Sequence, residues 1–112
     1  MSEVIEVNNV ETLSTAYVDL VRHDSPVDGS GTRIDSFTIM PIVNPDKALF
    51  RAEMNGDEIF TDFKIGVEVE YPFPLPYHDP WKVQSNQSLI LQMKSVDGTN
   101  VGAIGKIIGR KL

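Results

Sequence analysis

Few residues in this sequence could do acid–base chemistry. Each of its two histidines precedes an aspartate, in His23-Asp24 and His78-Asp79. Such a pair can orient a general base in a hydrolase, although that geometry comes more often from residues that are distant in the sequence. No serine lies in a Gly-x-Ser-x-Gly elbow, and two histidines without cysteine make a weak zinc site. We therefore expect no enzyme, no metal and no cofactor, and we interpret both histidines as loop residues.

Carboxylates between residues 23 and 35 could bind a cation. Asp24, Asp28 and Asp35 fall at positions 1, 5 and 12 of a calcium-loop template, with Gly29 at position 6. The match fails at position 3, where Pro26 has no side-chain oxygen, and at position 12, where calcium loops carry the longer glutamate. We interpret the segment as an acidic loop.

The composition limits the functions that remain. The 112 residues, 41% of them hydrophobic, suffice for one core and not for two, so we expect a single domain over residues 1–112. The net charge of −6 repels a phosphate backbone, so nucleic acid is not an expected partner. The basic cluster of Lys106, Arg110 and Lys111 has no interleaved aromatic residue for base stacking, and we interpret it as solvated.

The sequence also limits where the protein works. The absence of cysteine excludes disulfides and thiolate chemistry. The start, MSEVIEVNNVETL, has acidic residues where a signal peptide carries a basic segment, and no window approaches 18 apolar residues. We expect a soluble protein without a membrane segment, made in a cytoplasm.

Alternation of apolar and polar residues with period two recurs along the chain and predicts β-strands with one dry face. The longest example runs from Glu58 to Tyr71, with Gly66 marking a bulge or bend. Asn55-Gly56 lies between this run and the alternating residues 48–54, which predicts a hairpin with a type I′ turn. The face expected to be buried comprises Ile59, Thr61, Phe63, Ile65, Val67, Val69 and Tyr71. The carboxylates opposite, at Asp62, Glu68 and Glu70, are typical of a solvated strand face.

Further strands are predicted at 3–7, 33–43, 88–94 and 100–108, and at 13–22, where a short helix is the alternative. With turn signals at the spacing typical of sandwiches, the chain is predicted to be an all-β antiparallel sandwich of about seven or eight strands. The cysteine and tryptophan landmarks of an immunoglobulin domain are absent, and nothing else in the sequence fixes strand order. We expect a jelly roll before an immunoglobulin-like sandwich.

The arm at residues 70–81, EYPFPLPYHDPW, holds four of the seven prolines and four of the nine aromatic residues. Its prolines remove ladder donors, so it must leave the sheet or follow its edge. It either seals its own core with Phe73 and Trp81 or docks on a neighbouring subunit, where Tyr and Trp are common anchors. A sugar platform is the third alternative. The residues expected at a partner interface are Tyr71, Phe73, Leu75, Tyr77, His78 and Trp81.

The C-terminal third, QSNQSLILQMKSVDG followed by VGAIGKIIG, resembles the closing strand pair of small single-jelly-roll virion proteins. Bacteriophage cement, decoration and minor capsid proteins are similar to this chain in size, acidity and lack of cysteine. The resemblance implies that the protein bridges major capsid subunits and stabilises the shell. It carries no motif from which contact residues could be transferred.

These observations predict a non-enzymatic structural protein of a virus particle that acts through protein–protein contacts. The expected partners are the major capsid protein or copies of the chain itself, as a homo-oligomer for which a trimer is one expected size. The expected localisation is the virion. The alternative is a carbohydrate-binding module that stacks sugars on Tyr71, Tyr77 and Trp81, and an enzyme using His78 and Asp79 is a third hypothesis.

Overall fold

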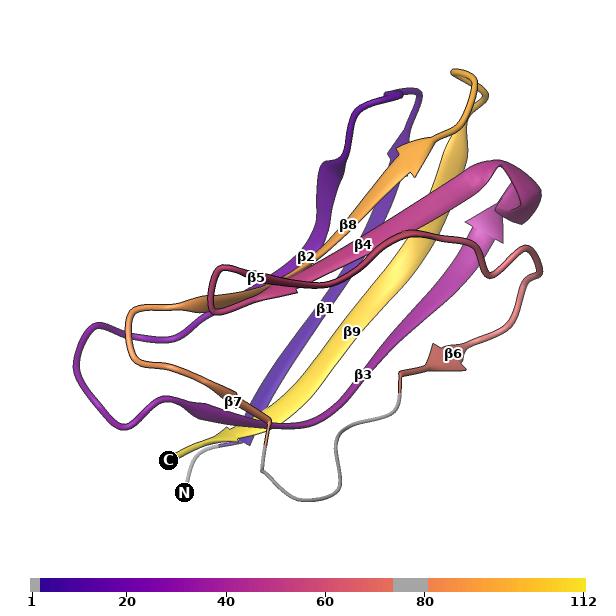
Figure 1. Cartoon of the computed structure of the whole chain (residues 1–112). Coiled ribbons are helices and arrows are strands. Elements are labelled where there is room, and N and C mark those ends of the chain that lie inside the picture. Colours follow the sequence, from indigo (N-terminus) through magenta and orange to yellow (C-terminus); the bar gives the residue numbers. More distant parts are fainter. Residues whose placement is uncertain (1–2, 74–80) are drawn as a thin grey trace.

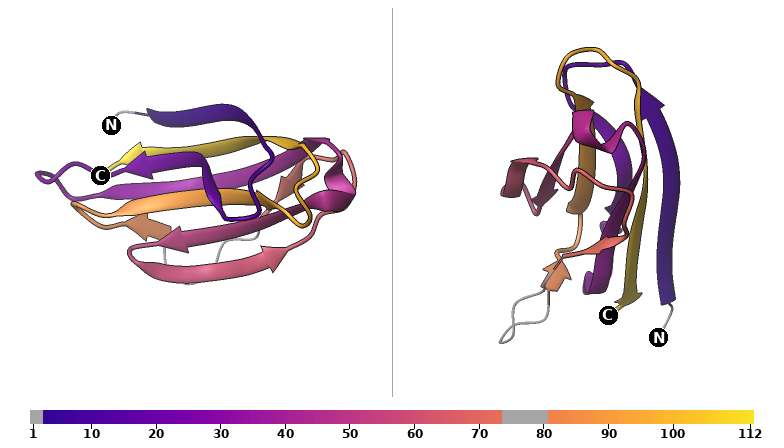
Figure 2. Two further views of the ribbon diagram at one scale, coloured as in Figure 1. Left: turned by 90° about the horizontal axis from the view of Figure 1, so that it is seen from above. Right: turned by 90° about the vertical axis from the view of Figure 1, so that its right-hand side faces the viewer.

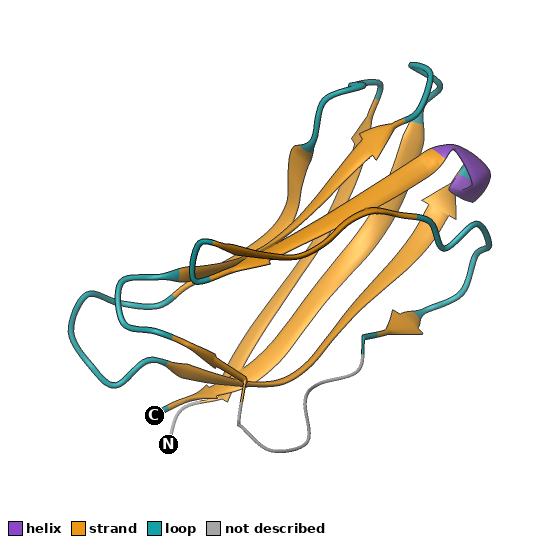
Figure 3. Ribbon diagram, in the orientation of Figure 1, coloured by secondary structure: helices purple, strands orange, loops and turns teal. Residues whose placement is uncertain are grey.

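The computed structural model describes residues 3–73 and 81–112, and in this part of the chain nearly all regular structure is β (Figure 1, Figure 3). One short 3-10 helix, η1 (Pro45–Lys47), precedes the fourth strand. The strands are β1 (Glu3–Thr12), β2 (Val18–Asp24), β3 (Thr32–Val43), β4 (Ala48–Met54), β5 (Asp57–Phe63), β6 (Tyr71–Pro72), β7 (Trp81–Val83), β8 (Ser88–Ser95) and β9 (Val101–Lys111).

The strands form two antiparallel sheets that pack face to face (Figure 2). The A sheet has the order β1-β9-β3-β6, with β7 also paired to β3, and the B sheet has the order β2-β8-β4-β5. When β6 and β7 are counted as one interrupted strand, the first strand pairs with the last, the second with the next to last, and so on to the β4–β5 hairpin. A ribbon of antiparallel pairs wrapped into two sheets is a jelly roll.

The predicted β-sandwich is therefore confirmed, and its strand order differs from that of an immunoglobulin domain. An immunoglobulin sandwich keeps its first two strands in one sheet, whereas β1 and β2 here lie in different sheets. The alternating β8 residues Leu89, Leu91 and Met93 are fully buried. They meet Phe37 and Ile107 of the A sheet in one core between the sheets.

The strand predicted from Glu58 to Tyr71 is instead two strands joined by a crossing segment. β5 ends at Phe63, residues 64–70 carry the chain from the edge of the B sheet to the edge of the A sheet, and β6 begins at Tyr71 (Figure 1). Gly66, with φ of 81°, turns the chain out of an extended path. The bend foreseen at this glycine is thus real, but the strand does not resume after it.

This crossing changes which side chains are buried. Asp62, the residue before the end of β5, also has a positive φ, 50°, which breaks the strand alternation. Val67 and Val69 were expected to face the core, and they are 54% and 47% exposed. Two apolar side chains thus lie in solvent beside two exposed glutamates, Glu68 and Glu70.

Two local expectations have different outcomes. The hairpin at Asn55-Gly56 is confirmed, because these residues join β4 to β5 with φ of 55° and 83°. The strand predicted at 13–22 begins only at Val18 and continues to Asp24. His23 consequently lies in a strand rather than in a loop, and it is buried.

Candidate functional site

The structure places half of the predicted interface residues, all of them beside the core. Phe73 is 8% exposed and belongs to the core, and Tyr71 and Trp81 are half-buried against it. The other three predicted residues lie outside the described part of the chain: Leu75, Tyr77 and His78.

Phe73 is the centre of an aromatic cluster at the open side of the sandwich. Its ring centroid lies between 4.7 and 5.5 Å from four other rings, those of Phe37, Phe60, Phe63 and Tyr71. Trp81 stacks on Phe37 at 5.3 Å. The two ends of the arm therefore pack on the core of their own chain, and one face of the Trp81 ring is used in that packing.

His23 is held in a chain of hydrogen bonds that joins the two sheets. Its Nδ1 lies 3.0 Å from Glu6 Oε2 on β1, and its Nε2 lies 2.8 Å from Thr32 Oγ1 on β3. A carboxylate accepts at Nδ1, so Nδ1 carries a proton that it donates to Glu6. The order hydroxyl, imidazole, carboxylate is that of a nucleophilic triad, but Thr32 is 0% exposed and no substrate can reach it.

Two of the three carboxylates that fit a calcium-loop template, Asp24 and Asp35, are paired with arginines. The Arg22 guanidinium donates to Asp24 and lowers the pKa of that carboxyl below its ordinary value. Asp35 forms ion pairs with Arg33 at 3.5 Å and with Arg110 at 3.3 Å. Within residues 3–73 and 81–112, no group of three histidines or carboxylates is placed to hold a metal ion.

The outer face of the B sheet is covered by paired charges. A hydrogen bond from the Tyr17 hydroxyl to Asp62, 2.6 Å long, lowers the pKa of that carboxyl and joins the β5 edge to the network. The ion pairs on this face are Arg22 with Asp19 and Asp24, Arg51 with Glu53 and Glu58, and Lys94 with Asp62. These charges are therefore paired within the chain.

The outer face of the A sheet is chemically different, because apolar side chains extend across it from the edge strand β1 to β3. Strand register sets Ile5 of β1 beside Ile108 of β9, and Ile104 of β9 beside Met40 of β3. Ile5 and Val7 are 55% and 57% exposed, and the other three are half-buried. We call these five residues the apolar stripe: Ile5, Val7, Met40, Ile104 and Ile108.

Lys106 lies in the centre of the apolar stripe. It is the β9 residue between Ile104 and Ile108 on the outward side, and its cross-strand neighbour on β1 is Val7. In the described residues its ammonium has no ion-pair partner. A cation among apolar side chains is a specific place for an incoming carboxylate.

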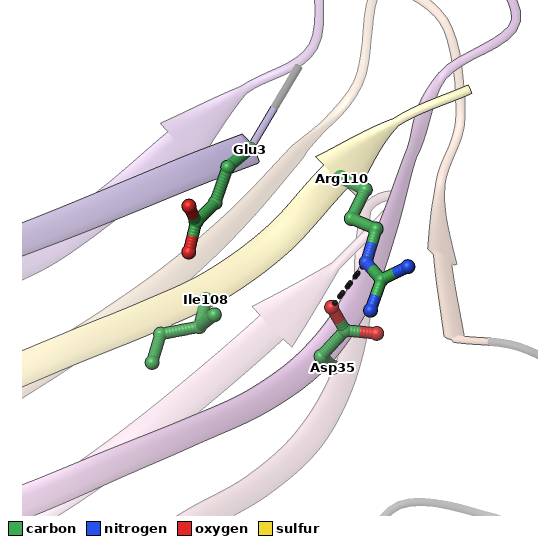
Figure 4. A pocket seen from close by; sticks show the side chains of 4 residues that line it. All are labelled: Glu3, Asp35, Ile108 and Arg110. Atoms are coloured by element: carbon green, nitrogen blue, oxygen red, sulfur yellow. Dashed lines mark ion pairs between the residues drawn. The ribbon is translucent and has the colours of Figure 1, made fainter. Parts of the chain in front are cut away.

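A pocket of about 450 Å³ hollows one end of this face (Figure 4). Ile108 lines it together with three charged residues, Glu3, Asp35 and Arg110. The pocket thus continues the apolar stripe, and its rim carries charges of both signs. A protruding side chain of a partner could anchor there, as anchors do in interface pockets.

The sequence reasoning missed this face for an identifiable reason. The cluster Lys106, Arg110 and Lys111 was interpreted as a solvated tail, but β9 is the second strand of the A sheet and Lys106 stands in its middle. Alternation along β9, with Ile104 and Ile108 on the side opposite Ile107, was a signal that could have revealed a second apolar face.

Among the described residues, no helix has the length and apolar character needed to cross a bilayer. Models of known protein families and the sequences of curated proteins give no match to this chain.

Proposed function

We propose that this protein is a non-enzymatic structural component of a virus particle, of the bacteriophage cement, decoration or minor capsid type. It acts by contacts with other protein subunits, either copies of itself or the major capsid protein. Jelly rolls serve in viral capsids and also in lectins, so the fold supports the proposal without deciding it.

The observation that carries the proposal is the contrast between the two outer faces. The B sheet pairs its outward charges within the chain, whereas the A sheet exposes Ile5 and Val7 around Lys106, which has no ion-pair partner among the described residues. Apolar surface bordered by polar residues is typical of a protein–protein contact. Folding of the single chain leaves Ile5 and Val7 exposed, whereas binding of a partner to the A sheet would bury them.

A carbohydrate platform receives less support from the same geometry. Tyr71 lies edge-on to Phe63 and within 4.9 Å of Phe73, while Trp81 stacks on Phe37. A ring surface that packs in the core cannot contact a sugar. For this reason we propose assembly with other protein subunits as the function.

The proposal is tested on virus particles purified through a density gradient from an infected culture that carries the gene. Peptides of this chain are expected in the particle fraction at a fixed ratio to the major capsid protein. Recovery of the chain only from the particle-free supernatant would overturn the proposal. A glycan-array screen of wild-type and Trp81→Ala protein would then test the carbohydrate alternative.

A further inference from the structure

We propose that the apolar stripe of one copy receives the segment Val67–Glu70 of a second copy of the same chain. The inference rests on the proposed function and names the partner of the A-sheet face. Its starting point is the exposure of Val67 and Val69, which alternate like buried strand residues and yet lie in solvent, 54% and 47% exposed.

The segment Val67–Glu70 has the chemistry of a docking element. It crosses from β5 to β6, and a hydrogen bond from the Val69 backbone N–H to the Val67 carbonyl, 3.0 Å long, gives it a local turn. Glu68 and Glu70 are exposed and form no ion pair within the described residues. The side chains of two valines and two glutamates are therefore all exposed on this one segment.

The apolar stripe offers the complementary groups. Ile5 and Val7 are exposed apolar side chains, and Lys106 next to Val7 is a cation without an ion-pair partner within residues 3–73 and 81–112. The acidic residues on the same face lie away from that centre. Asp35 is already paired with two arginines, and Glu3 and Glu11 lie at the two ends of the β1 ladder.

Charge also favours a second copy as the occupant. The chain as a whole carries a net charge of −6, so most of its surface repels another copy. The outward residues of β1, β9 and β3 include three cations and three anions, so this face has no net charge. The six residues are Glu3, Glu11, Arg33, Asp35, Lys106 and Arg110. An acidic segment of a second copy can approach here without that repulsion.

The same charges disfavour symmetric contacts. A two-fold axis through the centre of the stripe would set Lys106 against its own copy. Pairing β1 with β1 of a second copy would bring together strands that carry Glu3, Glu6 and Glu11 and no cation. A head-to-tail contact between different surfaces avoids both repulsions.

The position of the two surfaces fits such a contact. β1 is one edge of the A sheet, and β6, which follows the segment directly, lies at the other edge (Figure 1). Within one chain the segment lies at the β3 side of the A sheet, and β3 and β9 separate it from Ile5 and Val7 on β1. Each copy can instead offer a segment to one neighbour and a stripe to the other, which generates a ring if the rotation closes.

The test reverses the charges on each surface separately and then on both together. Self-association of each variant is measured by sedimentation velocity over a concentration series. Lys106→Glu alone and Glu68→Lys with Glu70→Lys are each expected to raise the dissociation constant about tenfold or more, because like charges then face each other. The triple variant is expected to recover the wild-type constant to within about threefold.

Two matched controls are Lys111→Glu, on the same strand, and Asp46→Lys in η1, which are expected to change the constant by less than about twofold. Far-UV circular dichroism confirms that each variant is folded. A wild-type chain that stays monomeric, or a triple variant no better than the single reversals, would overturn the inference. Presence of the chain in purified particles would leave the proposed function standing in either case.

Discussion

Asp97 illustrates how single residues fix the turns of this fold. It lies in the turn between β8 and β9, where its Oδ1 accepts from the Thr99 backbone N–H at 3.0 Å and its Oδ2 pairs with Lys47 at 3.1 Å. Hydrogen bonds from Thr99, side chain first and then backbone, together with Lys47 lower the pKa of Asp97 to about 2. The ionised form therefore stabilises the folded state.

We expect Asp97→Asn to lower the melting temperature at neutral pH and to lose part of the acid sensitivity of the wild type. A depressed folded-state pKa gives stability that is fully present above the unfolded value, near 3.8, and is lost as the pH falls toward about 2. Thermal melts from pH 7 to pH 2 check this. A difference between wild type and variant that does not shrink below about pH 4 would contradict the assignment.

At the residue scale, the hydrogen-bond partners of His23 could not be predicted from the sequence. The adjacent Asp24 suggested a dyad for His23, but alternation along β2 points neighbouring side chains to opposite faces, and Asp24 pairs with Arg22 in solvent. The true partners, Glu6 and Thr32, come from strands of the other sheet. The packing of the A sheet on the B sheet brings these two residues to His23.

At the scale of elements, the sequence pattern predicted the strands that stay in one sheet. The prediction was wrong where the chain passes from one sheet to the other. The hairpin at Asn55-Gly56 and the strands β3 and β8 follow from local alternation and turn chemistry. The break after Phe63 does not, because the alternation continues through Val67 and Val69 even though the chain has left the B sheet. Alternation of apolar and polar residues shows which side chains are apolar. Whether those side chains are buried depends on which other elements pack against them.

Phe73 follows β6 directly and lies at the centre of the aromatic cluster, so Phe73→Ala is expected to be strongly destabilising. The substitution removes a ring that contacts four others and leaves a cavity, with an expected cost of about 3 kcal/mol or more. Urea unfolding at low protein concentration measures it. Val27→Ala, at a side chain 72% exposed, is the control and should change stability by less than about 0.5 kcal/mol. Equal effects of the two would refute a core role for Phe73.

Gly105 lets β9 approach β2 closely. A Cβ at this position would lie 2.5 Å from Val21 Cγ1 and 2.9 Å from Leu20 Cγ. Gly105→Ala is therefore expected to lower the free energy of unfolding by about 1–3 kcal/mol through overpacking. Val21→Ala removes the nearest obstacle, so the double variant should be more stable than the sum of the single losses by about 0.5 kcal/mol or more. Strict additivity would show that the two side chains do not compete for space.

At the scale of the whole molecule, the two outer faces of the sandwich differ in chemistry. The B-sheet face balances its own charges, and the A-sheet face combines the apolar stripe, Lys106 and the pocket at Ile108. The interface predicted from the sequence lies in the arm, whose described ends pack on the core, whereas the contact that we propose lies on the A sheet. Alternation along β9 indicates an outward apolar side, but its neighbours on β1 and β3 follow only from the strand order.

The most direct test of the account is a cross-link between two different copies. The chain has no cysteine, so Val7→Cys and Val69→Cys each introduce a single thiol at an exposed position. The two variants, carrying tags of different size, are mixed and treated with a short thiol–thiol cross-linker. Val27→Cys mixed with Val7→Cys is the control, because Val27 is more exposed than Val69. We expect the Val7–Val69 product to exceed both the control product and the Val7–Val7 product. A Val7–Val69 yield no higher than that of the control would contradict the head-to-tail contact.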